Sequence, residues 1–294
     1  MTARPRPAAE LDVTEDLVRR LLAAQHPDLA DRPLLLADSG WDNVIFRLGA
    51  ELAVRLPRRA AAVPLVAHEQ RWLPTLAPRL PLPIPAPVRI GAPGEGYPWP
   101  WSVLPWFPGT TALATPPADL GATADVLGRF LAALHQPAPA DAPVNPFRGR
   151  PVATCTERIH ERLDQLGPAV DRRALLTVLA SAVAAPVDPG PAVWLHGDVH
   201  PGNLVVDDGA VSAVIDFGDL TAGDPASDLA VAWMLFPPEV RPRFVAATSH
   251  DDPAVWRRAR GWAVNLGLAI LAHSAEHPDF RTLGLTTLAQ AIDG

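Results

Sequence analysis

The densest run of polar side chains in the sequence is the octet HGDVHPGN at residues 196–203, which holds two histidines, an aspartate and an asparagine. In an extended segment alternate side chains point to the same side, so His196, Asp198 and His200 could offer nitrogen and oxygen ligands to a metal ion. A zinc hydrolase also needs further ligands and a poised base, whereas the other histidines are scattered along the chain. A metal site at the octet stays open as an alternative.

A second interpretation starts from Asp198 and Asn203, which are separated by four residues, and from IDFG, whose Asp216 follows thirteen positions after Asn203. H-x-D-x-x-x-x-N followed by D-F-G is the arrangement of phosphoryl-transfer enzymes with a kinase-like fold. A carboxylate is a natural acceptor for the proton of an attacking hydroxyl, and carboxylate and amide oxygens suit Mg²⁺. This spacing therefore indicates phosphoryl transfer.

With GDPASDLA at residues 223–230, these motifs resemble the aminoglycoside phosphotransferase family of small-molecule kinases, and the resemblance covers nearly the whole chain. It implies that Asp198 is the catalytic base and that Asn203 and Asp216 are the magnesium ligands. The two histidines of the octet then look like residues that shape the catalytic loop. The resemblance also implies Mg²⁺ and a nucleoside triphosphate, ATP or GTP, as cofactor and phosphate donor.

Further aspartates lie close to these motifs. DDG at residues 207–209 predicts a hairpin turn. Asp224, followed by a proline, predicts the N-cap of a helix. By similarity to the family, Asp228 would hold the catalytic loop from below. Asp219 lies near enough to the DFG unit to touch metal or substrate, and the sequence leaves its role undecided.

The elements that must position these residues fall into two groups, which predict an α+β, two-lobed protein-kinase-like fold. An antiparallel-sheet N-lobe with one helix, residues 1–107, would bind the nucleotide, and a larger, mainly α-helical C-lobe, residues 108–294, would bind the substrate. Apolar runs broken by turn residues predict the N-lobe strands, at residues 34–37, 44–48, 52–56, 88–90 and 101–104. Helical spacing is expected at residues 13–25, 64–76, 119–135, 156–166, 171–184, 225–236 and 253–273.

In the N-lobe, SGWDN at residues 39–43 lies between two predicted strands, where the fold has the loop that covers the phosphates. The segment has one glycine instead of the usual three. Ser39 and Gly40 are the candidate nucleotide contacts. All 25 basic residues are arginine, so the cation of the third strand falls to Arg55 in AVRLPRR, with Glu69 as its partner. Arginine can bond phosphate in a fork, and the segment resembles the macrolide-kinase branch of the family. The alternative is a solvated arginine at a strand end.

The segment YPWPWSVLPWFPG, residues 97–109, places an apolar strand before Pro-Gly, as expected for the hinge between lobes. Backbone groups near Trp106 and Phe107 would meet the purine there. The alternative is that these aromatic residues pack as ordinary core.

Composition narrows the classes of function. A net charge of −7 argues against a general binder of nucleic acid or anionic membranes. No apolar run reaches the roughly 20 residues of a membrane span, and the N-terminus lacks the apolar region of a secretory signal. Cys155 is the sole cysteine and cannot form an internal disulfide, so a cytoplasmic location is expected.

The expected partner is a small molecule whose hydroxyl receives the γ-phosphate. Family resemblance points to antibiotics, aminoglycosides first and macrolides second. A macrolide would favour the apolar helical surface expected around Trp233, Met234, Trp256 and Trp262. Metabolite kinases of the choline, homoserine or sugar-alcohol type share the motifs, and an inactive nucleotide-binding relative is suggested by the missing lysine and the thin phosphate loop. The sequence specifies neither the phosphate donor, ATP or GTP, nor the oligomeric state.

Overall fold

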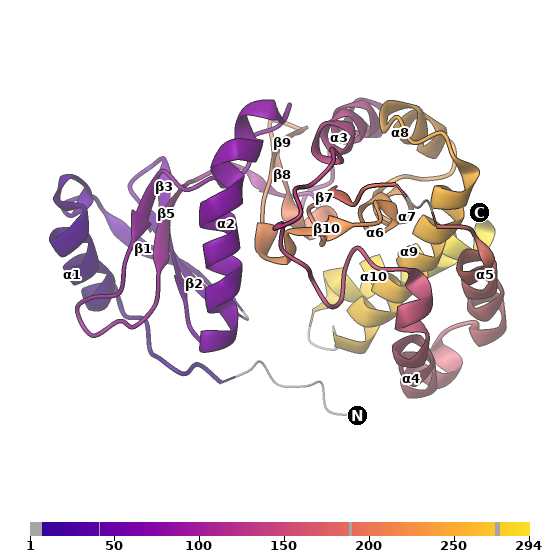
Figure 1. Cartoon of the computed structure of the whole chain (residues 1–294), viewed down its shortest axis with the longest axis horizontal. Helices are drawn as coiled ribbons and strands as arrows, with labels where there is room; N and C mark the ends of the chain where they lie inside the picture. The colour runs from indigo at the N-terminus through magenta and orange to yellow at the C-terminus, as the bar shows by residue number, and fades with distance from the viewer. Residues whose placement is uncertain (1–7, 41, 188–189, 274–276) are drawn as a thin grey trace. The chain divides into compact units, whose positions relative to one another are not determined.

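The computed structural model describes residues 8–40, 42–187, 190–273 and 277–294, which form two compact units (Figure 1). The first unit comprises residues 8–78 and 83–108. The second comprises residues 79–82 and 109–294. The first is built on an antiparallel sheet and the second is mainly helical, so the expected α+β fold class is confirmed.

The sheet of the first unit has five antiparallel strands in the order β1-β2-β3-β5-β4. The strands span β1 Leu34–Ser39, β2 Asn43–Leu48, β3 Leu52–Pro57, β4 Arg89–Gly91 and β5 Trp101–Pro105. β2 and β3 form a tight hairpin in which Leu48 pairs with Leu52, and Gly49 supplies the positive φ of 66° that this turn requires. The predicted strands are confirmed.

The alternation of side chains along β3 gives the sheet two different faces. Val54 and Leu56 are fully buried in the core that the sheet forms with helix α1 (Glu15–Gln25), whose N-cap is Thr14. Arg55, between them, points to the opposite face, where it meets Glu69 of helix α2 (Val63–Leu76). The period of two along the strand therefore places one charged residue in an otherwise apolar strand next to a helix carboxylate.

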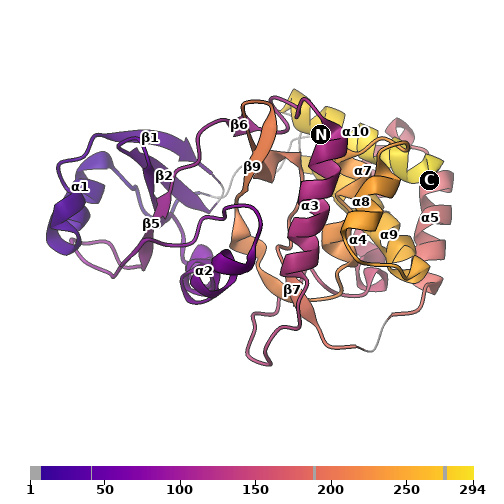
Figure 2. The ribbon, with the colours of Figure 1, turned by 90° about the horizontal axis from the view of Figure 1, so that it is seen from above.

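Helix α9 (Pro253–His273) lies among the other helices of the second unit (Figure 2). It is buried along most of its length and packs against α4, α5, α6 and α10. The surrounding helices span α3 Leu120–Leu134, α4 Thr156–Leu166, α5 Arg172–Ala184, α6 Ala226–Leu229, α7 Ala232–Leu235, α8 Arg241–Ala247 and α10 Pro278–Asp293. Within the described ranges, no helix has the length and apolar character needed to cross a membrane.

The single helix expected from residue 225 to 236 is wrong, because the chain forms two short helices there, α6 and α7. The predicted N-cap is wrong by one residue, because Pro225 is the N-cap and α6 begins at Ala226, although Asp224 Oδ1 accepts the N–H of Ala226 at 3.1 Å. Between the two helices the backbone has a hydrogen bond of the 3-10 type, in which the N–H of Val231 donates to the carbonyl of Asp228, three residues earlier, at 3.2 Å. Both helices are buried on nearly all sides, so tertiary packing, rather than helix propensity, sets this local geometry.

Two small sheets carry the polar motifs of the second unit. β7 (Val193–Leu195) pairs with β10 (Thr221–Gly223), while β8 (Leu204–Asp207) lies between β6 (Thr110–Thr111) and β9 (Ala210–Val214). The octet therefore connects β7 to β8, and the DFG unit connects β9 to β10. Asp207 pairs with Ala210, which confirms the predicted hairpin turn. These pairings bring the octet and the DFG unit side by side.

Candidate active site

The start of the octet is held by a buried carboxylate. Asp228 is fully buried, and its two oxygens accept the backbone N–H groups of His196 at 2.8 Å and Gly197 at 2.9 Å. Nε2 of His135 lies 3.3 Å from the same carboxylate. Because charge-assisted hydrogen bonds to backbone N–H groups are strong and directional, Asp228 fixes the path of the chain where the octet begins.

The two histidines of the octet use their ring nitrogens for local hydrogen bonds. His196 donates from Nε2 to the carbonyl of Ile215 at 2.9 Å, and its Nδ1 accepts the N–H of Asp198 at 3.2 Å. His200 Nδ1 accepts the N–H of Gly202 at 2.9 Å. Among the residues that the structure describes, no group of three or more His, Cys, Asp or Glu could hold a metal ion. The metal site formed by His196, Asp198 and His200 is therefore wrong.

The structure brings together the residues on which the second interpretation rests. Asn203 donates from Nδ2 to the carbonyl of Asp198 at 2.9 Å. The carbonyl of Asn203 accepts the N–H of Ile215, the neighbour of Asp216, at 2.9 Å. Asp216 has φ 63° and ψ 69°. This left-handed conformation is uncommon for a residue other than glycine, and such residues occur often at functional sites. The loop and the DFG unit thus meet at the main chain of Asn203 and Ile215, next to Asp216.

The chemistry of this donor set fits a magnesium ion. With its amide nitrogen directed at Asp198, Asn203 turns its amide oxygen away from the loop backbone. Asp216 adds a carboxylate two residues after the end of β9. Mg²⁺ in phosphoryl-transfer sites takes one or two such protein oxygens together with phosphates and water, so the absence of a larger cluster does not conflict with it.

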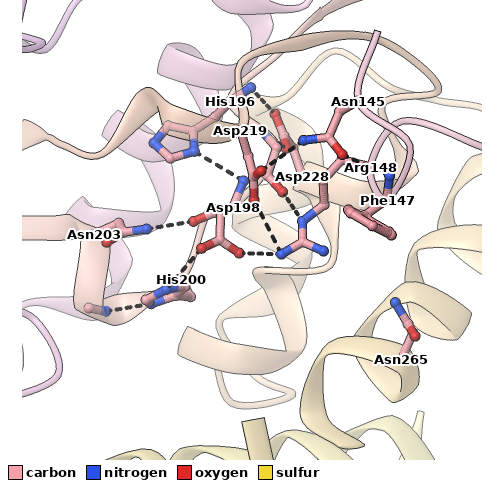
Figure 3. Close-up of polar contacts among 12 residues, drawn as sticks. Asn145, Phe147, Arg148, His196, Asp198, His200, Asn203, Asp219, Asp228 and Asn265 are labelled. Carbon is pink, nitrogen blue, oxygen red and sulfur yellow. Dashed lines mark hydrogen bonds and ion pairs between the residues drawn. The ribbon is translucent and has the colours of Figure 1, made fainter. Parts of the chain in front are cut away.

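Asp198 is held by Arg148, an arginine that lies outside every motif of the sequence (Figure 3). Arg148, between α3 and α4, donates from Nη2 to Oδ1 of Asp198 at 2.9 Å and from Nε to the carbonyl of Gly197 at 2.5 Å. His200 Nε2 lies 3.5 Å from the other carboxylate oxygen. Burial alone would raise the pKa of Asp198, but His200 and Arg148 outweigh it and hold that pKa well below its usual range.

Asp219, whose role the sequence left undecided, belongs to the same group. Its Oδ1 accepts the side-chain N–H of Asn145 at 2.8 Å, and its Oδ2 lies 3.4 Å from Nη2 of Arg148. Burial raises the pKa of Asp219, although the charge of Arg148 opposes this shift. No spacing ties Asn145 or Arg148 to the octet. An arginine and an asparagine in a proline-rich connection were the only available signal.

In the first unit, Arg55 and Glu69 form a buried ion pair with 2.6 Å between Nη1 and Oε1. Their side chains are 8% and 5% exposed, so the alternative of a solvated arginine is wrong. When the amide of Asn43 has its oxygen facing Arg55, that oxygen accepts from Nε at 3.1 Å and from Nη2 at 2.9 Å. The guanidinium is thus held on two sides, by Glu69 and by Asn43.

The segment expected to cover the phosphates is tied to a second arginine. Arg58 donates from Nη1 to the carbonyl of Gly40 at 2.9 Å and lies 3.4 Å from Oγ of Ser39. Gly40 also donates its N–H to the carbonyl of Asn43 at 2.9 Å. Residue 41 of this segment lies outside the described residues. The structure therefore places Ser39 and Gly40 beside the arginine-rich end of β3.

At the end of β5, the backbone N–H of Trp106 donates to the carbonyl of Glu51 at 2.7 Å. Its ring lies under the guanidinium of Arg47, 5.3 Å from the ring centroid. Phe107 follows at the surface, half-buried. The N–H of Trp106 is thus engaged within the first unit.

The apolar surface expected on the second unit is wrong. Trp262 is fully buried, and Trp233 and Met234 are each 5% exposed. Their rings and thioether pack inside the helical core, and the half-buried Trp256 lies 6.3 Å from Trp233 between ring centroids. Most of the residues expected at this surface therefore pack against other helices of the same unit.

Comparisons with known proteins agree with the fold and the motifs. The model of the family described as "Phosphotransferase enzyme family" matches residues 33–262. The structure resembles the GDP complex of aminoglycoside 2'-phosphotransferase-IIIa, with a TM-score of 0.70 and 19% identity over 96% of this chain and 99% of that one. It also resembles the apoenzyme of macrolide 2'-phosphotransferase MphH from Brachybacterium faecium, with a TM-score of 0.62 and 22% identity over 93% and 98% of the two chains.

A third similar structure is the ternary complex of streptomycin, ATP and APH(2")-IIa, with a TM-score of 0.60 and 17% identity over 95% of this chain and 97% of that one. A search of curated protein sequences gave no match. At these identities the likeness to solved structures establishes the fold, and the family model adds the class of reaction.

Proposed function

Because this chain belongs to the phosphotransferase enzyme family, we propose that it transfers the γ-phosphate of ATP or GTP to a hydroxyl group of a small molecule. The observation that carries this proposal is the arrangement at the octet. The carboxylate of Asp198 is held by Arg148, its main chain is held by Asn203, and Asp216 follows the end of β9 by two residues. These residue types, in this order, are the ones that phosphoryl transfer to an alcohol requires.

Asp198 is proposed as the group that orients the hydroxyl and accepts its proton. Its low pKa keeps it ionised, which suits a carboxylate that must receive a hydrogen bond from the substrate before the proton moves. Carboxylate oxygens accept more than one hydrogen bond, so the contacts to Arg148 and His200 leave lone pairs for the substrate hydroxyl.

Asn203 and Asp216 are proposed to hold Mg²⁺ through one amide oxygen and one carboxylate. When bound, the ion would neutralise charge on the transferring phosphate. The strained backbone of Asp216 supports this assignment, because a left-handed aspartate persists only where the surrounding structure holds it. The hydrogen bond from Asn203 to the carbonyl of Asp198 ties the orientation of the ligand to the position of the base.

The first unit is proposed to bind the nucleotide. Arg55 would contact the α- and β-phosphates, with Glu69 holding it in place, and Ser39 and Gly40 would cover them. The buried pairing of Arg55 supports this proposal, because a permanently charged fork held on two sides is prepared for phosphate. Backbone groups of Trp106 and Phe107 are proposed to contact the purine.

Antibiotics are the proposed substrate class, aminoglycosides first and macrolides second. The similar structures include complexes of relatives with kanamycin and with streptomycin, and a macrolide 2'-phosphotransferase. Kanamycin and streptomycin are ligands of those relatives, and for this reason they are among the compounds to test.

The deciding experiment is a phosphorylation screen of the purified full-length protein with Mg²⁺ and either ATP or GTP. The acceptors would be kanamycin, streptomycin, gentamicin, a set of macrolides, choline, homoserine and sugar alcohols, with mass spectrometry to detect an added phosphoryl group. Asp198→Asn run in parallel gives the background. Transfer to an aminoglycoside or a macrolide supports the proposal, and transfer only to a metabolite assigns a metabolite kinase. If nucleotide binds and no acceptor is phosphorylated, the chain is a binding relative and the proposal fails.

A further inference from the structure

Arg148 makes a two-point contact that spans the peptide between Gly197 and Asp198. Its Nε reaches the carbonyl of Gly197 at 2.5 Å, and its Nη2 reaches Oδ1 of Asp198 at 2.9 Å (Figure 3). Nε and Nη2 lie on one edge of the planar guanidinium, so the two contacts form a fork. A fork that grips a main-chain oxygen and the next side chain sets the side-chain rotamer of Asp198 relative to its own backbone.

A second carboxylate, that of Asp219, lies near the same nitrogen of Arg148. Nη2 lies 3.4 Å from Oδ2 of Asp219, and Oδ1 of Asp219 accepts the side-chain N–H of Asn145 at 2.8 Å. The amide oxygen of Asn145 accepts the N–H of Phe147, which closes the turn that leads to Arg148. The side chain of Arg148 is 20% exposed, so water competes weakly for these contacts. Asn145, Arg148 and Asp219 thus form a connected network that restrains the orientation of the arginine.

This network differs in kind from an ordinary surface ion pair. An exposed pair contributes little and does not control orientation. Here the arginine contacts the carboxylate that is proposed to accept the substrate proton, and displacing such a group by about 1 Å can cost on the order of 100-fold in rate.

We propose that Arg148 is a positioning residue for phosphoryl transfer: it holds the Asp198 carboxylate in the orientation in which it meets the acceptor hydroxyl, while Asp219 and Asn145 hold Arg148. The inference rests on the function proposed above. It assigns Asp219 to the support of Arg148 and gives the segment 145–148, outside every sequence motif, a part in the reaction.

The test compares Arg148→Ala, Arg148→Lys and Arg150→Ala in the full-length protein, using the best acceptor from the screen. Arg150 is an exposed arginine two residues further along the same segment, so it controls for loss of charge there. Arg148→Ala is expected to lower kcat about 100-fold, as for a displaced base, and to leave KM for the nucleotide within about twofold. Arg148→Lys keeps the charge but cannot form the fork, so it is expected to recover less than a tenth of the lost rate.

Chemical rescue separates positioning from a role in folding. Added guanidinium or methylguanidinium is expected to raise kcat of Arg148→Ala at least tenfold and to leave Asp198→Asn unchanged. Thermal melting shows which variants fold. If Arg148→Ala does not fold, Arg148→Gln is used in its place. A crystal structure of the variant should show the Asp198 carboxylate rotated away from its position in the wild-type protein.

Two results would overturn the inference. A folded Arg148→Ala protein with unchanged kcat would make the network merely structural, and one with a higher kcat would make Arg148 a blocking group on the base. If the wild-type protein itself phosphorylates no acceptor, the proposed function fails, and this outcome is distinct from an active wild type whose Arg148 variants are also fully active.

Discussion

Gly197 and the main chain of Asp219 lie so close together that a side chain does not fit between them. A Cβ added at Gly197 would lie 2.3 Å from the carbonyl oxygen of Asp219. Gly197 also has φ 89°, which side chains disfavour. We expect Gly197→Ala to lower the free energy of unfolding by about 3 kcal/mol, the sum of backbone strain and overpacking, as measured by urea denaturation. The accompanying shift of the octet should also reduce kcat.

Gly96 provides the matched control for this substitution. It has φ 83°, and a Cβ added there would have no atom within 4 Å. Gly96→Ala should therefore show the backbone cost alone, about 1 kcal/mol. If both variants lose the same free energy of unfolding, the close approach of Gly197 to Asp219 does not contribute to the cost of Gly197→Ala.

The second prediction concerns the base. Asp198→Asn keeps the size of the side chain but cannot accept a proton at pH 7, so kcat should fall by about 10² to 10⁴-fold. Nucleotide affinity, measured by calorimetry, should change by less than about threefold, because the substitution removes no proposed nucleotide contact. Asp207→Asn, at an exposed position in the hairpin that follows, is the control and should retain full activity. An Asp198→Asn enzyme with the wild-type rate would exclude Asp198 as the base.

The third prediction separates stability from nucleotide binding at the Arg55–Glu69 pair. Arg55→Met leaves Glu69 buried without its 2.6 Å partner and should lower the free energy of unfolding by about 3 to 5 kcal/mol. Arg55→Met combined with Glu69→Met replaces both charges and should recover most of that loss, as seen in chemical denaturation. Both variants should bind nucleotide more weakly than the wild type. If the double variant binds nucleotide normally, Arg55 serves stability alone.

The fourth prediction is a loss of stability in acid that depends on His250. Burial and the neighbouring His135, whose Nδ1 lies 2.9 Å from Nε2 of His250, lower the pKa of His250 from 6.5 to about 4, although Asp224 and Asp251 oppose the shift. Between pH 6.5 and about 4, His250 therefore binds a proton in the unfolded chain but not in the folded chain. The free energy of unfolding should be highest above pH 6.5 and should fall as the pH decreases toward 4.

His250→Gln should flatten this decline, and urea denaturation at a series of pH values measures it. His160→Gln, a substitution in helix α4, is the control and should leave the decline in place. A protein whose stability rises on acidification through this range would show that His250 gains a proton on folding.

Much of the fold follows from local patterns in the sequence. The predicted helix over residues 156–166 matches α4 to the residue, because its apolar positions recur at helical spacing. The hairpin at residues 207–209 was predictable because Asp and Gly accept the positive φ of its turn. The split between α6 and α7 was not predictable, because buried contacts on all sides, rather than local preference, set the backbone there.

The sequence by itself determined the class of chemistry, because the spacing of Asp198, Asn203 and Asp216 is short enough to be read along the chain. Only the tertiary structure decided what surrounds them. Arg148 lies fifty positions from Asp198, and no local pattern predicts that two such segments meet. The same holds for the burial of Arg55, which depends on a helix packing over its strand. Local backbone preferences are encoded residue by residue, whereas ion pairs across loops and helices exist only once the core has brought distant segments together.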